Sequence, residues 1–109
     1  MQITIRGDKI TVTGAIKEYV TEKLVKLDKY FEQPEDIKAN AVIKVKNRLQ
    51  TIEVTVPTSR FTLRAEVSHE DLYAAVDLAV ELMFNSNLNP AVIRAAKDLK
   101  ELNIYLSTI

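Results

Sequence analysis

The sequence of 109 residues contains no cysteine and a single histidine, His69. Without cysteine there is no disulfide framework and no thiolate chemistry, which suits a reducing compartment. One histidine leaves no metal site of the His and Cys type, and we find no cysteine or serine triad. The two glycines, Gly7 and Gly14, do not form a phosphate-binding glycine loop. No set of residues converges on a reaction, so we expect a protein that is not an enzyme and has no cofactor, metal or small-molecule substrate.

The chain also has no apolar stretch that approaches the ~20 residues of a membrane span. Its opening residues, MQITIRGDKI, alternate apolar and polar side chains as a strand does and do not have the pattern of a signal peptide. A chain of 109 residues has the length of one domain, and at that size about two thirds of the unfolded surface can be buried. We therefore expect a single soluble, cytoplasmic domain with a two-layer core.

Positive charge is concentrated in the first part of the chain, although the net charge is zero. Residues 1–64 contain 12 Lys and Arg against 8 Asp and Glu, giving +4, and residues 65–109 contain 3 against 7, giving −4. A polyanion would therefore bind the first part of the chain. The overall neutrality argues against strong nonspecific binding to nucleic acid.

The first elements predicted by the pattern of apolar residues are a strand and a helix. Residues 2–6 alternate as a strand, which could continue after a bend over residues 9–12. The apolar positions of residues 16–31 recur with a helical period, and Thr13 has the residue type of an N-cap. Pro34 ends this helix.

Three strands and a second helix follow. Residues 39–46, 52–56 and 60–68 each alternate between apolar and polar positions, with turn residues between them. Ser68 can cap a helix whose apolar face lies within residues 72–83, and acidic residues in its first turn suit the positive end of the helix dipole. The predicted order is strand, helix, three strands, helix.

This order predicts an α+β fold. A helical crossover between the first two strands and short turns among the others give a four-stranded sheet with both helices on one face, in a two-layer sandwich. Asn89 and Pro90 have the residue types of an N-cap and first position, so an extra C-terminal helix would begin at Pro90, with its apolar face within residues 92–102. The last residues, NIYLSTI, would form either an added strand or a contact patch.

The most informative segment joins the strand RFTLRAEVS to the helix start SHEDLYAAVD, within residues 60–77. With the run KLVKLDKYF at residues 23–31, it resembles the ribosome hibernation promoting factors, a small-subunit-binding family that includes the ribosome-associated inhibitors. About the first 80 residues match in order. The resemblance implies a β-α-β-β-β-α fold like that of double-stranded-RNA-binding domains, with residues 1–84 as a ribosome-binding domain and residues 85–109 as a divergent helical tail of the same domain.

The resemblance implies a translation inhibitor of the stress response that occupies the decoding region of the small ribosomal subunit. Its contacts would be made to the phosphates of ribosomal RNA, because no aromatic residue falls on the open sheet face in this register to stack on bases. The expected contact residues are cations on the first helix and on the sheet and its turns: Lys23, Lys26, Lys29, Lys44, Lys46, Arg48, Arg60 and Arg64.

Simpler explanations exist for several of these residues. Lysine, arginine and threonine on an exposed sheet face also serve solubility. Lys23 falls inside the apolar arc of the first helix, where its stem could pack while its ammonium reaches water. Tyr73 is expected in the core, and His69 is expected to stabilise packing or a turn between strand and helix.

One departure from the family gives an alternative function. The family's second helix continues past DLYAAVD into a strongly basic stretch, whereas this chain has no Lys or Arg from residue 65 to residue 93. Three explanations fit this change. The chain is a degenerate member of the family, or its sequence was altered after Glu81 by a shifted reading frame or by engineering, or its tail is used for protein contacts. The alternative is a self-associating module that keeps the fold, has lost RNA binding and forms a homodimer through its tail.

Overall fold

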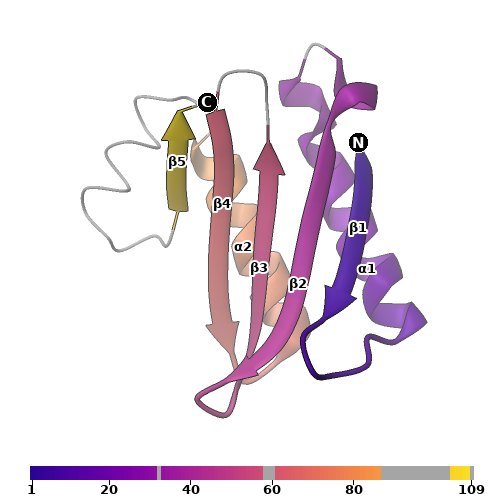
Figure 1. Ribbon diagram of the computed structural model, residues 1–109, viewed down its shortest axis with the longest axis vertical. Helices are drawn as coiled ribbons and strands as arrows, with labels where there is room; N and C mark the ends of the chain where they lie inside the picture. Colours follow the sequence, from indigo (N-terminus) through magenta and orange to yellow (C-terminus); the bar gives the residue numbers. More distant parts are fainter. Residues whose placement is uncertain (32, 58–60, 87–103, 109) are drawn as a thin grey trace.

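The computed structural model describes residues 1–31, 33–57, 61–86 and 104–108. Figure 1 shows a single twisted sheet with two helices behind it. The elements in chain order are strand β1 (Gln2–Gly7), helix α1 (Gly14–Leu24), the 3-10 helices η1 (Val25–Tyr30) and η2 (Pro34–Asp36), strands β2 (Lys38–Lys46), β3 (Leu49–Pro57) and β4 (Phe61–His69), helix α2 (Leu72–Ser86) and strand β5 (Ile104–Thr108).

The sheet has the strand order β1-β2-β3-β4-β5. Strand β1 is parallel to β2, which requires the crossover through α1, and each later neighbour is antiparallel. Both helices cover the same face of the sheet (Figure 1). The predicted α+β sandwich is confirmed. The sheet differs from the prediction in having a fifth strand, because β5 pairs with the outer edge of β4.

The core lies between the sheet and the two helices. Alternate residues of β2, β3 and β4 meet the apolar faces of α1 and α2, as the period of two predicts. Burial of each large apolar side chain stabilises the fold by about 1.5–3 kcal/mol. The largest fully buried residues are Leu24, Leu27, Ile43, Ile52, Leu63 and Met83.

Helix α1 begins where the sequence predicts, but its last part is wound more tightly. The Thr13 hydroxyl accepts a hydrogen bond from the Ile16 amide at 3.3 Å, which confirms Thr13 as the N-cap. The α-helix ends at Leu24 and continues as η1. Leu24 and Leu27 are three residues apart and both fully buried. A turn of three residues brings both onto one face, and such turns are frequent at helix ends.

The junction between β4 and α2 differs from the prediction that Ser68 caps the helix, which is wrong. Ser68 belongs to β4 and pairs with Thr51, and their hydroxyl oxygens lie 2.8 Å apart. The cap is Asp71, whose Oδ1 accepts a hydrogen bond from the Tyr73 amide at 3.0 Å. The helix starts later because β4 continues to pair with β3 as far as His69.

Strand β1 ends at Gly7, and residues 9–12 do not extend it as the sequence allowed. The chain turns back sharply here, with Lys9 at a φ of 62°. A Cβ atom on Gly7 would collide with the carbonyl oxygen of Ile10. Glycine is therefore required at this turn, because any larger residue would force the backbone to move.

The tail is described in part. Of the two alternatives for the final segment, the structure shows the added strand, β5, which lies beside β4 in Figure 1. The predicted helix that begins at Pro90 falls outside the described residues. None of the helices in the described ranges is long and apolar enough to cross a membrane.

Candidate nucleic-acid interface

An open groove runs between the first and second helical segments. Lys23 from α1 and Lys26 from η1 line one side, and Asp77, Val80 and Glu81 from α2 line the other. The helical period of the two segments creates this arrangement, because Lys23 and Lys26 are three residues apart and lie on neighbouring positions of one face. Both lysines therefore lie at the groove between the helices.

Lys23 is held at the groove by an aromatic ring and a carboxylate. Its ammonium nitrogen lies 5.3 Å from the centre of the Tyr19 ring, within the range of a cation–π contact. The same nitrogen lies 3.7 Å from Oδ1 of Asp77. The Lys23 side chain is 31% exposed. Its stem is therefore packed while its ammonium reaches the groove, which is the snorkelling geometry, and the ammonium is still within reach of an anion.

Tyr19 joins the two helices. Its hydroxyl donates a hydrogen bond of 2.6 Å to Asp77 Oδ1. Its ring meets the Tyr73 ring edge to face, with the ring centres 4.8 Å apart. The hydrogen bond to Asp77, followed by burial and the charges of Asp77, Asp71 and Glu22, raises the pKa of Tyr19 to about 12. Tyr73 is 42% exposed, so the prediction that it belongs to the core is wrong.

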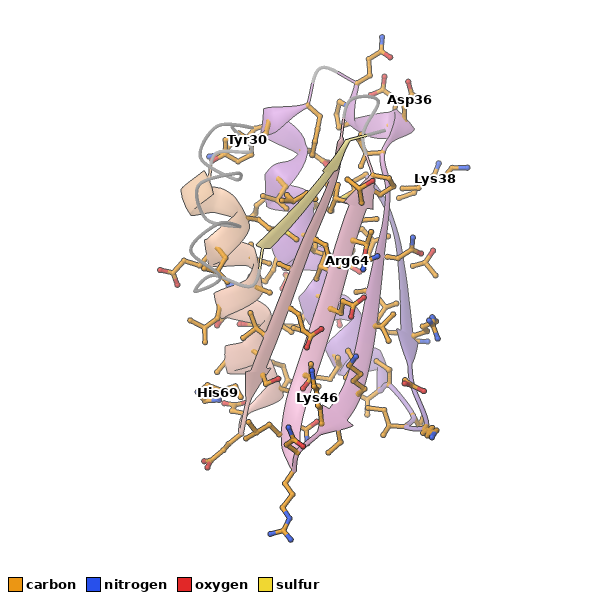
Figure 2. The ribbon with its side chains drawn as sticks, turned by 60° about the vertical axis from the view of Figure 1, so that its left-hand side comes forward. Tyr30, Asp36, Lys38, Lys46, Arg64 and His69 are labelled. Atoms are coloured by element: carbon orange, nitrogen blue, oxygen red, sulfur yellow. The ribbon has the colours of Figure 1, made fainter. Side chains whose placement is uncertain are left out.

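The other cation expected on this helical segment, Lys29, also lies beside an aromatic ring. Its ammonium nitrogen is 5.3 Å from the centre of the Tyr30 ring, and the residue is exposed. Figure 2 shows Tyr30 on the helical side of the molecule. Lys23, Lys26 and Lys29 therefore form a group on the segment α1–η1, which we call the helical lysines.

The open face of the sheet carries the second predicted group of cations, and here carboxylates accompany them. Glu53 on β3 lies 3.7 Å from the Lys44 ammonium and 3.8 Å from Nε of Arg64. Glu66 on β4 accepts a hydrogen bond of 3.1 Å from Lys46. Figure 2 shows Lys46 and Arg64 on the sheet face, away from the helices. These cations are already paired within the chain, and we call the five residues the sheet-face ion network.

The network changes the ionisation of Glu66. Burial raises the pKa of this carboxyl, but the hydrogen bond and charge of Lys46 and the charge of Lys44 outweigh burial and hold the pKa below its usual value. Glu66 is therefore ionised at neutral pH and keeps Lys46 in place.

The remaining predicted residues lie apart. Arg48 is exposed in the turn between β2 and β3, where it and Asn47 have φ values of 68° and 52°. Such a turn with two positive φ values fits the twist of a hairpin. Arg60 lies outside the described residues. The predicted cations therefore do not form one patch, because the helical lysines and the sheet-face ion network lie on opposite faces of the sheet.

His69 has the structural role that the sequence indicated. Its Nδ1 accepts a hydrogen bond of 2.9 Å from the Asp71 amide, which fixes the turn between β4 and α2. Figure 2 shows His69 at the end of the sheet where this turn lies. Within the described part of the chain, no three histidine or acidic side chains are grouped to hold a metal ion.

The acidic partners of the predicted cations were not identified from the sequence, either on the sheet face or at the groove. The alternation of β3 and β4 places Glu53 and Glu66 on the same face as the cations, but their ion pairs depend on the strand register. Asp77 was assigned no partner, because its contacts with Tyr19 and Lys23 depend on how the two helices pack. Only the spacing of Tyr19 and Lys23, four residues apart on one face of α1, signalled part of this contact.

Known proteins resemble this chain in sequence. The family model of the Sigma 54 modulation protein / S30EA ribosomal protein matches residues 3–85. The ribosome hibernation promotion factor of Bacillus subtilis (strain 168) is 42% identical over 80 residues, and that of Staphylococcus aureus (strain COL) is 42% identical over 79 residues. Each alignment covers 72% of this chain and 42% of the relative, so the matching part of the chain spans less than half the length of these curated relatives.

Solved structures confirm the fold. The Thermus thermophilus Protein Y N-terminal domain superposes with a TM-score of 0.71 at 31% identity, covering 80% of this chain and 96% of that domain. A ribosomal subunit interface protein from Coxiella burnetii superposes with a TM-score of 0.66 at 18% identity, covering 79% of this chain and 92% of that chain. The second likeness bears on the fold alone. Because the family model spans most of the sequence, the chain belongs to the Sigma 54 modulation protein / S30EA ribosomal protein family.

Proposed function

We propose that this chain is a non-catalytic, cytoplasmic ribosome-binding protein of the hibernation type. It would inhibit translation under stress by occupying the decoding region of the small ribosomal subunit, through contacts with the phosphates of ribosomal RNA. The proposal is supported by the family membership and by the 42% sequence identity to two ribosome hibernation promotion factors. The matching region of those relatives is less than half of their length, so the proposal concerns the activity of this domain.

The observation that carries the proposal is the position of Lys23 and Lys26 on one wall of the groove between α1 and α2. Lys23 keeps its ammonium at the groove because the Tyr19 ring supports it. Lysine is a point charge on a flexible stem, and it suits phosphate contacts that do not read base sequence. The helical lysines would therefore position the domain on the RNA backbone.

The sheet face contributes less in this proposal. Lys44 and Arg64 share Glu53, and Lys46 is paired with Glu66. A phosphate would have to displace these carboxylates, so each of these cations gives a smaller gain than an unpaired one. Lys23 has the same disadvantage because Asp77 lies 3.7 Å from its ammonium, whereas its neighbour Lys26 is exposed at the groove. Arg48, exposed in its turn, and Arg60 complete the set of proposed contacts.

The lack of Lys and Arg from residue 65 to residue 93 limits the affinity. Each phosphate contact contributes about 0.7–0.9 to the slope of log affinity against log salt. A domain that relies on a few lysines should therefore bind with a shallow salt dependence. It should release the subunit at lower salt than a relative whose second helix ends in a basic stretch.

The direct test is co-sedimentation of the full chain with small ribosomal subunits over a salt series. The variant Lys23→Glu/Lys26→Glu removes the two proposed contacts that line the groove, and Lys17→Glu/Lys38→Glu is the matched control. Lys17 and Lys38 are exposed and do not line the groove, so the control has the same net charge as the test variant. We expect binding by the wild type and the control and none by the test variant. Equal binding by both variants would contradict the proposal.

A further inference from the structure

Asp77 contacts both Tyr19 and Lys23 through the same oxygen atom. Its Oδ1 accepts the Tyr19 hydrogen bond at 2.6 Å and lies 3.7 Å from the Lys23 ammonium. Tyr19 and Lys23 are four residues apart on α1, so both reach the same point on α2. The carboxylate of Asp77 is therefore fixed at the position from which an external anion would approach Lys23.

We propose that Asp77 is a built-in competitor for phosphate at Lys23 and that it sets the affinity of the interhelical groove for RNA. The inference rests on the proposed function, because it takes Lys23 as a phosphate contact. It adds a residue that opposes binding, and it explains why a lysine at the groove coexists with a carboxylate on the facing wall.

The competition follows from charge and geometry. Lys23 is 31% exposed and Asp77 is 49% exposed, so both can be reached from solvent. A phosphate that binds the Lys23 ammonium must come close to Asp77, and two anions at one ammonium repel each other. The ion pair also reduces the counterion release that Lys23 can supply, because its charge is already partly neutralised.

Two features keep the carboxylate in place while an RNA approaches. The Tyr19 hydroxyl is neutral and its hydrogen bond to Asp77 does not depend on Lys23. Tyr19 is itself supported by the edge of the Tyr73 ring. The Tyr19 ring also holds Lys23.

Lys23 would keep its place over the Tyr19 ring even without Asp77. Neutralising Asp77 should therefore leave an unpaired ammonium that is already positioned at the groove.

The test variant is Asp77→Asn, which has nearly the same shape and keeps an oxygen that can accept the Tyr19 hydrogen bond. The matched control is Asp36→Asn, which removes the same charge from an exposed site in η2 outside the groove lining. The probe is a fluorescein-labelled uridine 12-mer, and its affinity for the full chain is measured by anisotropy between 0.05 and 0.5 M salt.

We expect Asp77→Asn to steepen the salt slope by about 0.7, the value for one further phosphate contact on a single strand. At ~0.1 M salt this corresponds to binding about fivefold tighter than the wild type. Asp36→Asn should change the affinity much less. In the variant Lys23→Gln/Asp77→Asn the gain should disappear relative to Lys23→Gln, because the competition acts through Lys23.

Several results would overturn the inference. If Asp77→Asn and Asp36→Asn increase the affinity equally, the gain is an effect of net charge. If Asp77→Asn still increases the affinity when Lys23 is replaced, Asp77 does not act through Lys23. Weaker binding by Asp77→Asn would mean that Asp77 orients Lys23 for binding. Failure of both wild type and Asp77→Asn to bind the probe at 0.05 M salt would also overturn it.

The inference and the proposed function fail in different ways. If small ribosomal subunits bind no variant while the uridine probe shows the gain that depends on Lys23, the ribosomal function fails and the role of Asp77 stands. If the subunits bind through Lys23 and Lys26 but Asp77→Asn gives no gain with the probe, the function stands and the inference fails.

Discussion

Glu53 and Glu66 lie directly opposite each other on neighbouring strands, as cross-strand partners on the open face of the sheet. Two carboxylates in this position repel each other. The structure compensates with three cations, because Lys44 and Arg64 pair with Glu53 and Lys46 pairs with Glu66. The sheet-face ion network therefore stabilises the sheet, and its cations are not simply a solvated surface.

Removing cations from this network should destabilise the fold in a manner that depends on salt. For Lys46→Gln and Arg64→Gln we expect losses of about 0.2–1 kcal/mol each in the free energy of unfolding, the range for exposed ion pairs. Urea denaturation at 0.02 M and 1 M salt measures the loss, with Lys38→Gln as a control at an exposed position of the same face. A loss that is equal at both salt concentrations would rule out ion pairing as its cause.

Glu66 should also contribute to the pH dependence of stability. Its pKa in the folded state lies below the usual value of 4.5 because Lys46 and Lys44 outweigh the effect of burial. The contribution is therefore present above pH 4.5 and is lost as the pH falls through the lower folded pKa. We expect Glu66→Gln to have a shallower decline in stability below pH 4.5 than the wild type, measured by urea denaturation at each pH. An identical decline in both proteins would show that Glu66 is not held in its ionised form.

The contact of Tyr19 with Asp77 should be visible in alkaline titration. The pKa of Tyr19 is raised to about 12, chiefly by its hydrogen bond to Asp77. The stabilisation from neutral Tyr19 is therefore complete below pH 10 and is lost as the pH rises through about 12. Ultraviolet difference titration, with Tyr19→Phe to identify the signal, should show a lower pKa in Asp77→Ala, which removes both the hydrogen-bond acceptor and the carboxylate charge. An unchanged pKa would contradict the contact.

Strand β5 should protect the edge of β4. It covers β4 residues 61–65, and an uncovered edge strand offers unpaired backbone groups to another chain. We expect a chain truncated after Ser86 to be less stable and to self-associate more than the full chain, as measured by sedimentation at rising concentration. If the full chain dimerises and the truncated chain stays monomeric, the tail forms the dimer contact instead.

The elements that sequence reasoning predicted correctly are those with a strong local period. The alternation in residues 39–46 and in residues 61–67 assigned Ala41, Ile43, Leu63 and Ala65 to the buried face, and all four are fully buried. The same alternation assigned Val45 to this face, which is wrong, because Val45 is 52% exposed near the end of its strand. Thr13 was recognised as a cap because its side chain acts on its own helix. These features depend on a few neighbouring residues, so the sequence is sufficient to predict them.

Features that depend on contacts between distant segments were not predicted correctly. Ser68 looked like a helix cap, but pairing with Thr51 across two strands keeps it in β4. Tyr73 fitted the helical apolar period, yet its ring packs on Tyr19 at the surface. The lysines of the candidate site were identified from the sequence. The ion pairs that carboxylates form with them could be recognised only from the strand register and the helix packing.

The most direct test of the central claim is a photo-cross-link from the groove to the ribosome. A photoreactive residue replaces Glu81, which lines the groove, and in a control protein it replaces Lys38, on the open face of the sheet. After irradiation with intact small subunits, we predict a cross-link from position 81 to ribosomal RNA of the decoding region and at most a weaker one from position 38. Cross-links from position 38 alone, or no RNA cross-link from position 81, would contradict the claim that this groove binds the ribosome.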